Sequence, residues 1–131
     1  MNCPKCKGEL TPFDFQGLNL DFCEECSGIW FEKGELAFYT ETSDDIPDFQ
    51  SALKRAVITH SACPQCRSTQ LVETPFMDSS DLKIDICPSC QGIFLDNHEL
   101  PKVEALSAGR EVLTKVGRAA RALRDQGYTP L

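Results

Sequence analysis

The sequence contains no long apolar run. No stretch approaches the roughly 20 apolar residues that a helix needs to cross a bilayer, and no charged segment followed by an apolar one opens the chain. We therefore expect no membrane span and no secretory leader, and a cytoplasmic location. Disulfides are disfavoured in that reducing compartment, so closely spaced cysteines indicate metal ligands rather than a disulfide framework.

Basic residues and histidines are also scarce. Lys and Arg number 13 against 20 Asp and Glu, which gives a formal net charge of -7 and a pI near 4.7. An acidic field repels phosphate backbones, so composition disfavours general nucleic-acid binding. No serine or carboxylate pair forms a recognisable catalytic set around His60 or His98, the only histidines. We therefore expect a protein that is not an enzyme.

Cysteine, in contrast, is abundant and clustered. One window holds Cys3, Cys6, Cys23 and Cys26, and the other holds Cys63, Cys66, Cys87 and Cys90. The spacings, C-x2-C-x16-C-x2-C and C-x2-C-x20-C-x2-C, are typical of four-cysteine zinc sites. Each window is too short to bury a core that offsets its chain entropy, so a cross-link is needed. The sequence predicts two metal ions per chain, each held by one set of four cysteines.

The ligand set restricts the metal and its chemistry. Four thiolates in a tetrahedron suit Zn2+ or a rubredoxin-like iron, and the ligands alone do not decide between them. Ligands that paired across the windows would close longer loops at a cost of about 1 kcal/mol more, so we expect local pairing. A catalytic zinc keeps one position open to water, whereas four cysteines fill all four. His60 as a replacement ligand, and His98 as more than a surface or capping residue, are the weaker alternatives.

The chain is an internal repeat. Cys3-Pro4-Lys5-Cys6 matches Cys63-Pro64-Gln65-Cys66, and Gly28-Ile29-Trp30-Phe31 matches Gly92-Ile93-Phe94-Leu95 after the second cysteine pair of each window. A duplicated unit of this kind is a structural module used twice. In the turns between paired cysteines, proline fixes one φ angle, and we expect Gly8, Gly28 and Gly92 to supply a positive φ. Ser68 breaks that glycine pattern.

Local patterns predict the elements of each module. Alternating apolar residues on both sides of Gln16-Gly17 predict a hairpin with a two-residue turn, and Leu82, Ile84 and Ile86 predict the matching strand in the second module, after a longer loop around residues 78–81. Residues 29–31 and 93–95 read as short apolar strands that cover the core, with an exposed aromatic docking patch as the alternative. Asp96 with Glu99 resembles a capping box, and Glu32 with Glu35 a weaker one, so a helix is expected after each.

The remaining segments join and extend the modules. We expect a first ribbon over residues 1–40, a linker over 41–62, a second ribbon over 63–100 and a tail over 101–131. In the linker, Phe49, Leu53, Ala56 and Val57 fall at helical spacing, which predicts a helix that packs between the modules. The tail reads as a basic amphipathic helix from Pro101 to Gln126, with six basic residues against three acidic ones. It could dock on its own acidic modules, on a protein partner or on nucleic acid.

With these residues in hand, the unit resembles the TFIIB-type zinc-finger family of transcription-factor-like zinc ribbons. The family pattern is CPxC, a hairpin, and then CPxCgGiWlDxGEL; the two copies here end in CEECSGIWFEKGEL and CPSCQGIFLDNHEL. The departures are Glu24 for proline, Phe94 for tryptophan and His98 for glycine, and none removes a ligand. The resemblance implies zinc at all eight cysteines and a rubredoxin-like ribbon in each copy. It favours zinc over iron.

The combined expectation is a small metal-stapled α+β protein, with two tandem zinc ribbons, a helical linker and a C-terminal α-helix. We expect a non-enzymatic adaptor that binds an unknown protein partner, and the family name suggests a connection with transcription. Nucleic-acid binding is the first alternative, because of the basic tail, although the acidic modules oppose it. A metal or thiol-redox sensor is the second.

Overall fold

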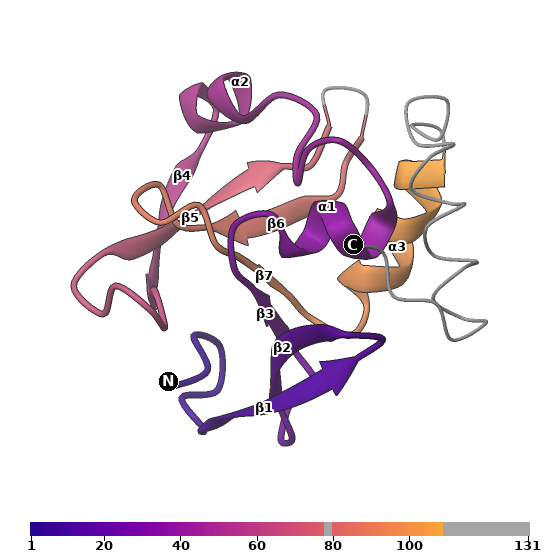
Figure 1. Cartoon of the computed structure of the whole chain (residues 1–131). Helices are drawn as coiled ribbons and strands as arrows, with labels where there is room; N and C mark the ends of the chain where they lie inside the picture. The colour runs from indigo at the N-terminus through magenta and orange to yellow at the C-terminus, as the bar shows by residue number, and fades with distance from the viewer. Residues whose placement is uncertain (78–79, 109–131) are drawn as a thin grey trace.

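A computed structural model describes residues 1–77 and 80–108 of the 131-residue chain. Its strands are β1 (Leu10–Phe15), β2 (Leu18–Cys23), β3 (Ile29–Phe31), β4 (Val57–Ala62), β5 (Gln70–Pro75), β6 (Lys83–Ile86) and β7 (Ile93–Leu95). Its helices are α1 (Glu35–Thr40), α2 (Phe49–Lys54) and α3 (Glu99–Ser107). The strands form one antiparallel sheet in the order β1-β2-β3-β7-β6-β5-β4 (Figure 1). The expected small α+β fold is confirmed.

Strands β3 and β7 join the two repeats. They run antiparallel through the middle of the sheet (Figure 1). Trp30 stands directly opposite Phe94 in their register. Strands β1, β2 and β3 come from the first repeat, and β5, β6 and β7 occupy the equivalent places in the second. The repeats therefore meet edge to edge in one continuous sheet, a form of coupling that the sequence patterns did not indicate.

The first hairpin has the turn that its sequence predicts. Gln16 and Gly17 both have positive φ, 54° and 83°, as a type I′ turn requires. The Asp14 carboxylate accepts a hydrogen bond of 3.0 Å from the Gly17 N–H. The register from Phe15 opposite Leu18 to Leu10 opposite Cys23 is thereby fixed, and Cys23 lies at the end of the hairpin next to the start of β1.

The sheet has two differently covered faces. Phe31, Ile93 and Leu95 pack with residues of α1, α2 and α3 on what we call the helix face. Trp30 and Phe94, one position along each strand, pack instead with the cysteines on the cysteine face. This alternation follows from the two-residue period of a strand. All five side chains are at most 2 % exposed, so the core interpretation is confirmed and the docking-patch alternative is wrong.

Helices α1 and α3 lie next to each other over the helix face (Figure 1). The Tyr39 hydroxyl on α1 donates a 2.7 Å hydrogen bond to Glu104 on α3, which links the two repeats a second time. Asp45, in the chain segment after α1, accepts hydrogen bonds from the N–H groups of Gly34 and Ala37 at 2.7 and 2.8 Å. A linker carboxylate therefore caps α1. Of the weaker capping box the structure has one half, in which the Glu32 N–H donates to the Glu35 carboxylate at 2.6 Å.

The linker differs in part from its prediction. Helix α2 forms as expected, with the Asp48 side chain as its N-cap. It ends at Lys54, however, and Val57, which we placed in the helix, begins strand β4. The run Val57-Ile58-Thr59 is β-branched and pairs with β5, and this pairing overrides the helical spacing. The buried Thr74 hydroxyl of β5 donates to the Ala52 carbonyl at 2.8 Å, so α2 packs on the second repeat. The four-segment division itself stays a prediction.

The second capping box is complete. The Glu99 N–H donates to the Asp96 carboxylate at 2.8 Å, and the Asp96 N–H donates to the Glu99 carboxylate at 3.0 Å. Helix α3 therefore begins two residues before Pro101, which falls in its first turn. The rest of the predicted tail helix, like residues 78–79 of the long loop, lies outside the described residues. None of the helices in residues 1–77 and 80–108 has the length and apolar character of a membrane span.

Glu99 gives the fold a predicted pH dependence. Burial, with repulsion from Asp96 and Asp85, raises the pKa of Glu99 from 4.5 to about 7, although the Asp96 N–H opposes the shift. The folded state then binds more protons than the unfolded state between these values, so this group's contribution to stability falls as pH rises through 7. Glu99→Gln keeps the acceptor for Asp96 and removes the charge. We expect it to raise the free energy of unfolding at pH 8 by on the order of 1 kcal/mol, allowing for partial solvent screening.

Urea denaturation of both proteins at several pH values checks this expectation. The gain from Glu99→Gln should shrink toward pH 5, where the wild-type carboxyl is itself protonated. Effects of pH on metal binding are common to both proteins and cancel in the difference. Glu9→Gln, an exposed charge removal on the other repeat, is the matched control and should show no such trend. A variant that is less stable than wild type at pH 8 would contradict the expected sign.

Candidate metal centres

The structure gathers the eight cysteines into two groups of four. Cys3, Cys6, Cys23 and Cys26 form the first centre, and Cys63, Cys66, Cys87 and Cys90 form the second; within each centre all sulfurs lie within 4.8 Å of one another. In each repeat one pair precedes the hairpin. The other begins at or directly after the last residue of the second strand and precedes the short apolar strand. The antiparallel hairpin brings the two pairs together, so the structure has the local grouping expected from the sequence.

The sulfur spacing tests whether an ion fits. Sulfur–sulfur distances are 3.6 Å for Cys3–Cys26 and 3.2 Å for Cys6–Cys23. In the second centre they are 3.7 Å for Cys63–Cys90 and 3.9 Å for Cys66–Cys87. A disulfide needs about 2.05 Å, whereas four sulfurs bound to one ion at about 2.3 Å lie about 3.8 Å apart. Both groups therefore fit a tetrahedral tetrathiolate ion.

The turns between paired cysteines share one backbone shape. The residue after the second cysteine has positive φ in all four: Lys7 (65°), Ser27 (62°), Arg67 (63°) and Gln91 (64°). Its N–H donates to the carbonyl of the first cysteine at 2.8–2.9 Å. Our expectation that Gly8, Gly28 and Gly92 supply the positive φ is therefore wrong, because that conformation is needed one residue earlier.

Ser68 marks the one turn that differs. In three turns the N–H of the first cysteine donates to the glycine carbonyl, as Cys87 does to Gly92 at 2.9 Å. In the turn after Cys63 the acceptor is the carbonyl of Thr69, one residue further along, at 2.8 Å. The missing glycine therefore lengthens this turn by one residue without moving its cysteines out of the centre.

Gly28 and Gly92 are required for a different reason. A Cβ on Gly92 would stand 2.1 Å from an atom of the Trp30 ring, and a Cβ on Gly28 would stand 2.2 Å from an atom of the Phe94 ring. Each aromatic ring thus lies against the turn of the opposite repeat. The glycines are needed for a close approach between repeats, which inspection of one repeat alone does not reveal.

The transcription factor zinc-finger family model matches residues 2–41 and 62–105, which together are more than half of the chain. The chain belongs to this zinc-ribbon family. Each matched segment holds one four-cysteine centre, so the two segments are tandem copies of the zinc ribbon. No curated protein and no solved structure matches the chain. Family and cysteine geometry together indicate that the two ribbons bind metal, as zinc ribbons do.

Backbone amides and burial set the thiol chemistry of each ribbon. Burial raises the pKa of Cys3 to about 12 and also raises the pKa of Cys63. Burial acts in the same direction on Cys23, but the N–H groups of Cys26 and Glu25 and the neighbouring thiols together lower its pKa to about 7. Similar contacts lower the pKa of Cys87, including the Cys90 N–H at 3.4 Å from its sulfur. Each ribbon therefore has a buried cysteine whose pKa is lowered, and a divalent cation would stabilise the thiolate form of its ligands.

A buried donor also fits ionised thiols. The Trp30 indole Nε1 is fully buried and has no hydrogen-bond partner within residues 1–77 and 80–108. It belongs to the same buried cluster as Cys3, Cys23, Cys63 and Cys87. A thiolate accepts hydrogen bonds far better than a neutral thiol. Metal binding would ionise the cysteines and so give the buried cluster that contains this donor stronger acceptors.

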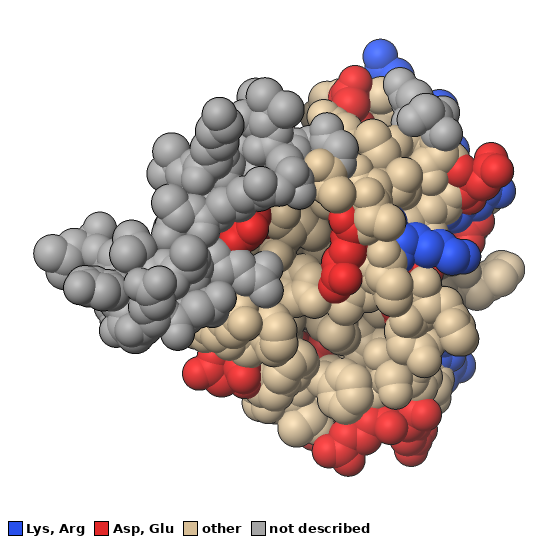
Figure 2. Space-filling model, turned by 90° about the vertical axis from the view of Figure 1, so that its right-hand side faces the viewer, with Lys and Arg blue, Asp and Glu red and all other residues tan. Residues whose placement is uncertain are grey.

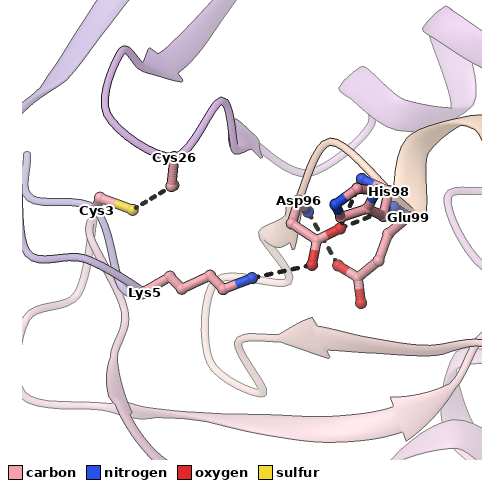
Figure 3. A network of polar contacts seen from close by, with 6 residues as sticks. All are labelled: Cys3, Lys5, Cys26, Asp96, His98 and Glu99. Carbon is pink, nitrogen blue, oxygen red and sulfur yellow. Dashed lines mark hydrogen bonds and ion pairs between the residues drawn. The ribbon is translucent and has the colours of Figure 1, made fainter.

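The two histidines stand apart from the ribbon ligands. Neither His60 nor His98 belongs to a metal-binding group among the described residues. His98 is exposed at the start of α3, where its backbone N–H donates to Asp96 at 2.9 Å (Figure 3). His60 is exposed on β4. The structure therefore agrees with the surface interpretation of His98 and does not place His60 among the ligands.

Proposed function

We propose that this chain is a non-enzymatic protein-interaction module that binds one Zn2+ in each ribbon. Four cysteines per centre supply a complete tetrahedron, which leaves no position for a water or a substrate. Zinc is proposed over iron because of the family. The bound ions would stabilise the cysteine face, where the buried apolar side chains of the described residues, besides the cysteines, are Leu10, Trp30, Leu71 and Phe94.

The observation that supports an interaction role is the outer strand β4. Val57 and Ile58 are 67 % and 70 % exposed, and the strand sequence VITHSA contains no Lys, Arg, Asp or Glu. Among the described strands β4 pairs with β5 alone. Proteins usually protect such edges with proline or charge, as β1 does at the opposite edge with Pro12 and Asp14. We infer that an extended segment of a partner protein adds to β4 as a further strand.

One substitution tests this surface. Ile58→Lys adds a charge to the exposed edge without touching a cysteine, and Thr11→Lys adds the same charge to exposed β1 at the opposite edge. Affinity capture with chemical cross-linking and mass spectrometry should recover the same partner from wild type and Thr11→Lys. Capture by Ile58→Lys should fall at least about 10-fold, the effect of losing roughly 1.4 kcal/mol of binding. Equal capture by Ile58→Lys at unchanged zinc content would refute the proposed surface.

Nucleic-acid binding is the second candidate, and one groove favours it. A groove of about 580 Å³ between the first turns of the two ribbons is lined by Lys7, Arg67 and His60, and none of its lining residues within 1–77 and 80–108 is acidic. Cys3 and Cys63 also line it, so bound thiolates would bring negative charge to its wall. Acidic side chains are spread across the face shown in Figure 2, and basic ones are fewer there. The thiolates beside the groove and the acidic side chains on this face favour a protein partner over nucleic acid.

Salt dependence separates the two candidates. Phosphate contacts predict a steep loss of affinity between two salt concentrations, whereas strand addition to an apolar edge predicts little change. The sensor alternative requires exchangeable metal, which chelator competition at equilibrium measures. Slow exchange and tight binding in both centres would favour the structural role of zinc that we propose.

A further inference from the structure

Each ribbon packs an aromatic ring against a glycine in a cysteine turn of the other ribbon. Trp30, from the first ribbon, lies against Gly92, two residues after Cys90 of the second centre. Phe94, from the second ribbon, lies against Gly28, two residues after Cys26 of the first centre. Both rings are at most 2 % exposed, and a Cβ at either glycine would overlap the ring. The contact is therefore close, buried and reciprocal.

These glycines are structural parts of the turns that hold the ligands. The Gly92 carbonyl accepts a hydrogen bond from the Cys87 N–H, and the Gly28 carbonyl accepts one from the Cys23 N–H, both at 2.9 Å. Gly92 also lies two residues after Cys90, in the same hydrogen-bonded turn. A ring that fixes the glycine therefore fixes the position of two ligands of the opposite centre.

Two further contacts connect the ribbons beside the rings. Trp30 and Phe94 are direct partners in the β3–β7 pair, so a shift of either strand displaces one ring relative to the other. Lys5, in the first turn of the first ribbon, forms a 3.1 Å ion pair with Asp96, which follows β7 of the second ribbon (Figure 3). Folding of one ribbon therefore fixes the position of side chains that contact the other ribbon.

We propose that the two centres bind zinc cooperatively, because each centre is completed by the aromatic ring of the opposite ribbon. The proposal rests on the proposed zinc binding. Metal binding and folding are coupled in small ribbons, so an empty centre leaves its own β-strands, and the ring that they carry, poorly held. Coupling between two binding sites is reciprocal. Binding at one site typically changes the affinity of the other by roughly 5- to 150-fold. We therefore expect zinc affinity at either centre to fall at least about 10-fold when the other is emptied.

Paired cysteine variants test the cooperativity. Cys6→Ser with Cys26→Ser empties the first centre, and Cys66→Ser with Cys90→Ser empties the second. Zinc affinity of the remaining centre is measured by competition with a chromophoric chelator. Trp30 is the single tryptophan, so its fluorescence should respond when zinc enters the second centre, although Trp30 belongs to the first ribbon. Two zinc ions per wild-type chain with independent, unchanged affinities would overturn cooperativity alone; a wild-type chain without zinc would overturn the proposed function as well.

A conservative variant separates the ring contact from general loss of folding. With cadmium in place of zinc, 113Cd NMR should give one signal per centre, assigned by which signal each cysteine pair variant loses. Phe94→Leu should shift and broaden the signal of the first centre more than that of the second, although Phe94 lies in the second ribbon. Phe76→Leu is the matched control, since Phe76 is equally buried in the second repeat but packs on the helix face. A Phe94→Leu effect confined to the second centre would overturn the crosswise assignment.

Discussion

Removal of zinc by a strong chelator is expected to unfold the described sheet. Four of the ligands, Cys3, Cys23, Cys63 and Cys87, are at most 1 % exposed and form much of the cysteine face. Structural zinc in small ribbons contributes about 10–16 kcal/mol of apparent binding free energy, whereas a domain of this size has only about 5–15 kcal/mol of net stability. Without the ions, only the packing on the helix face remains, and we expect it to be too little to keep the sheet folded. Far-UV circular dichroism and thermal melting with and without chelator measure the change.

Two controls accompany the chelation experiment, namely re-addition of zinc and removal of a single ligand. Re-addition of excess zinc should restore the spectrum and the melting transition, which distinguishes metal loss from irreversible damage. Cys87→Ser should bind one zinc instead of two and melt at a markedly lower temperature, because it removes a buried ligand of the second centre only. Melting that stays unchanged after complete metal removal would show that the ions do not stabilise the fold.

Alanine at Gly92 or Gly28 is expected to have the second largest effect. The new Cβ would overlap the Trp30 or Phe94 ring at 2.1 or 2.2 Å, and these rings are buried in the centre of the sheet. Relief of the overlap requires β3 and β7 to separate or the cysteine turn to shift. Overpacking of a buried site typically costs 1–3 kcal/mol, and we expect about 3 kcal/mol here because backbone must move. Urea denaturation of the zinc-loaded variants measures the loss.

Gly8→Ala is the matched control for the glycine prediction. Gly8 occupies the equivalent place in the first turn, but its Cβ would meet the end of the flexible Glu25 side chain at 3.0 Å and the Cys6 sulfur at an ordinary contact distance of 3.5 Å. The expected loss is under about 1 kcal/mol. In addition, the loss from Gly92→Ala should shrink in a Trp30→Leu background, since the clashing ring atoms are then absent. Equal losses at Gly8 and Gly92 would contradict the close approach between the ribbons.

The sequence predicted the features that depend on neighbouring residues. The cysteine spacing predicted the two groups of four, the Gln16-Gly17 pair predicted the first hairpin, and Asp96 with Glu99 predicted the start of α3. These features form from groups close together in the chain, where propensity and turn chemistry act directly. A repeat also predicts that two units share a fold. It does not predict how the units meet.

The contact between the repeats was not predicted, because a repeat does not show how its two units meet. The sequence nevertheless contains an indication of this contact. Residues 29–31 and 93–95 are apolar at every position, which is typical of a strand covered on both faces and at both edges. The glycine before each run suggests a positive φ when the turn is taken alone, but neither Gly28 nor Gly92 has one. Its real constraint comes from a ring roughly one repeat away in the sequence.

The prediction for the segment that forms β4 was wrong for a different reason. Two local sequence patterns disagree there, and the helical one is not the one that the structure follows. The apolar spacing of Phe49, Leu53, Ala56 and Val57 suits a helix, whereas Val57-Ile58-Thr59 favours a strand. Pairing of Val57 with Glu73 and of Ile58 with Val72 decides in favour of the strand. That outcome depends on where β5 lies, which no pattern within residues 41–62 reveals. The exposed edge that carries the proposed function is a consequence of this tertiary pairing.

The most direct test of the account is the metal content of the purified chain, measured by elemental analysis together with native mass spectrometry. Two four-cysteine centres predict two zinc ions per chain, retained in the folded protein and released on unfolding. The protein should be colourless, because Zn2+ has a filled d shell. One ion or none per chain would contradict the two-centre account, and red-brown protein with bound iron would contradict the assignment of zinc.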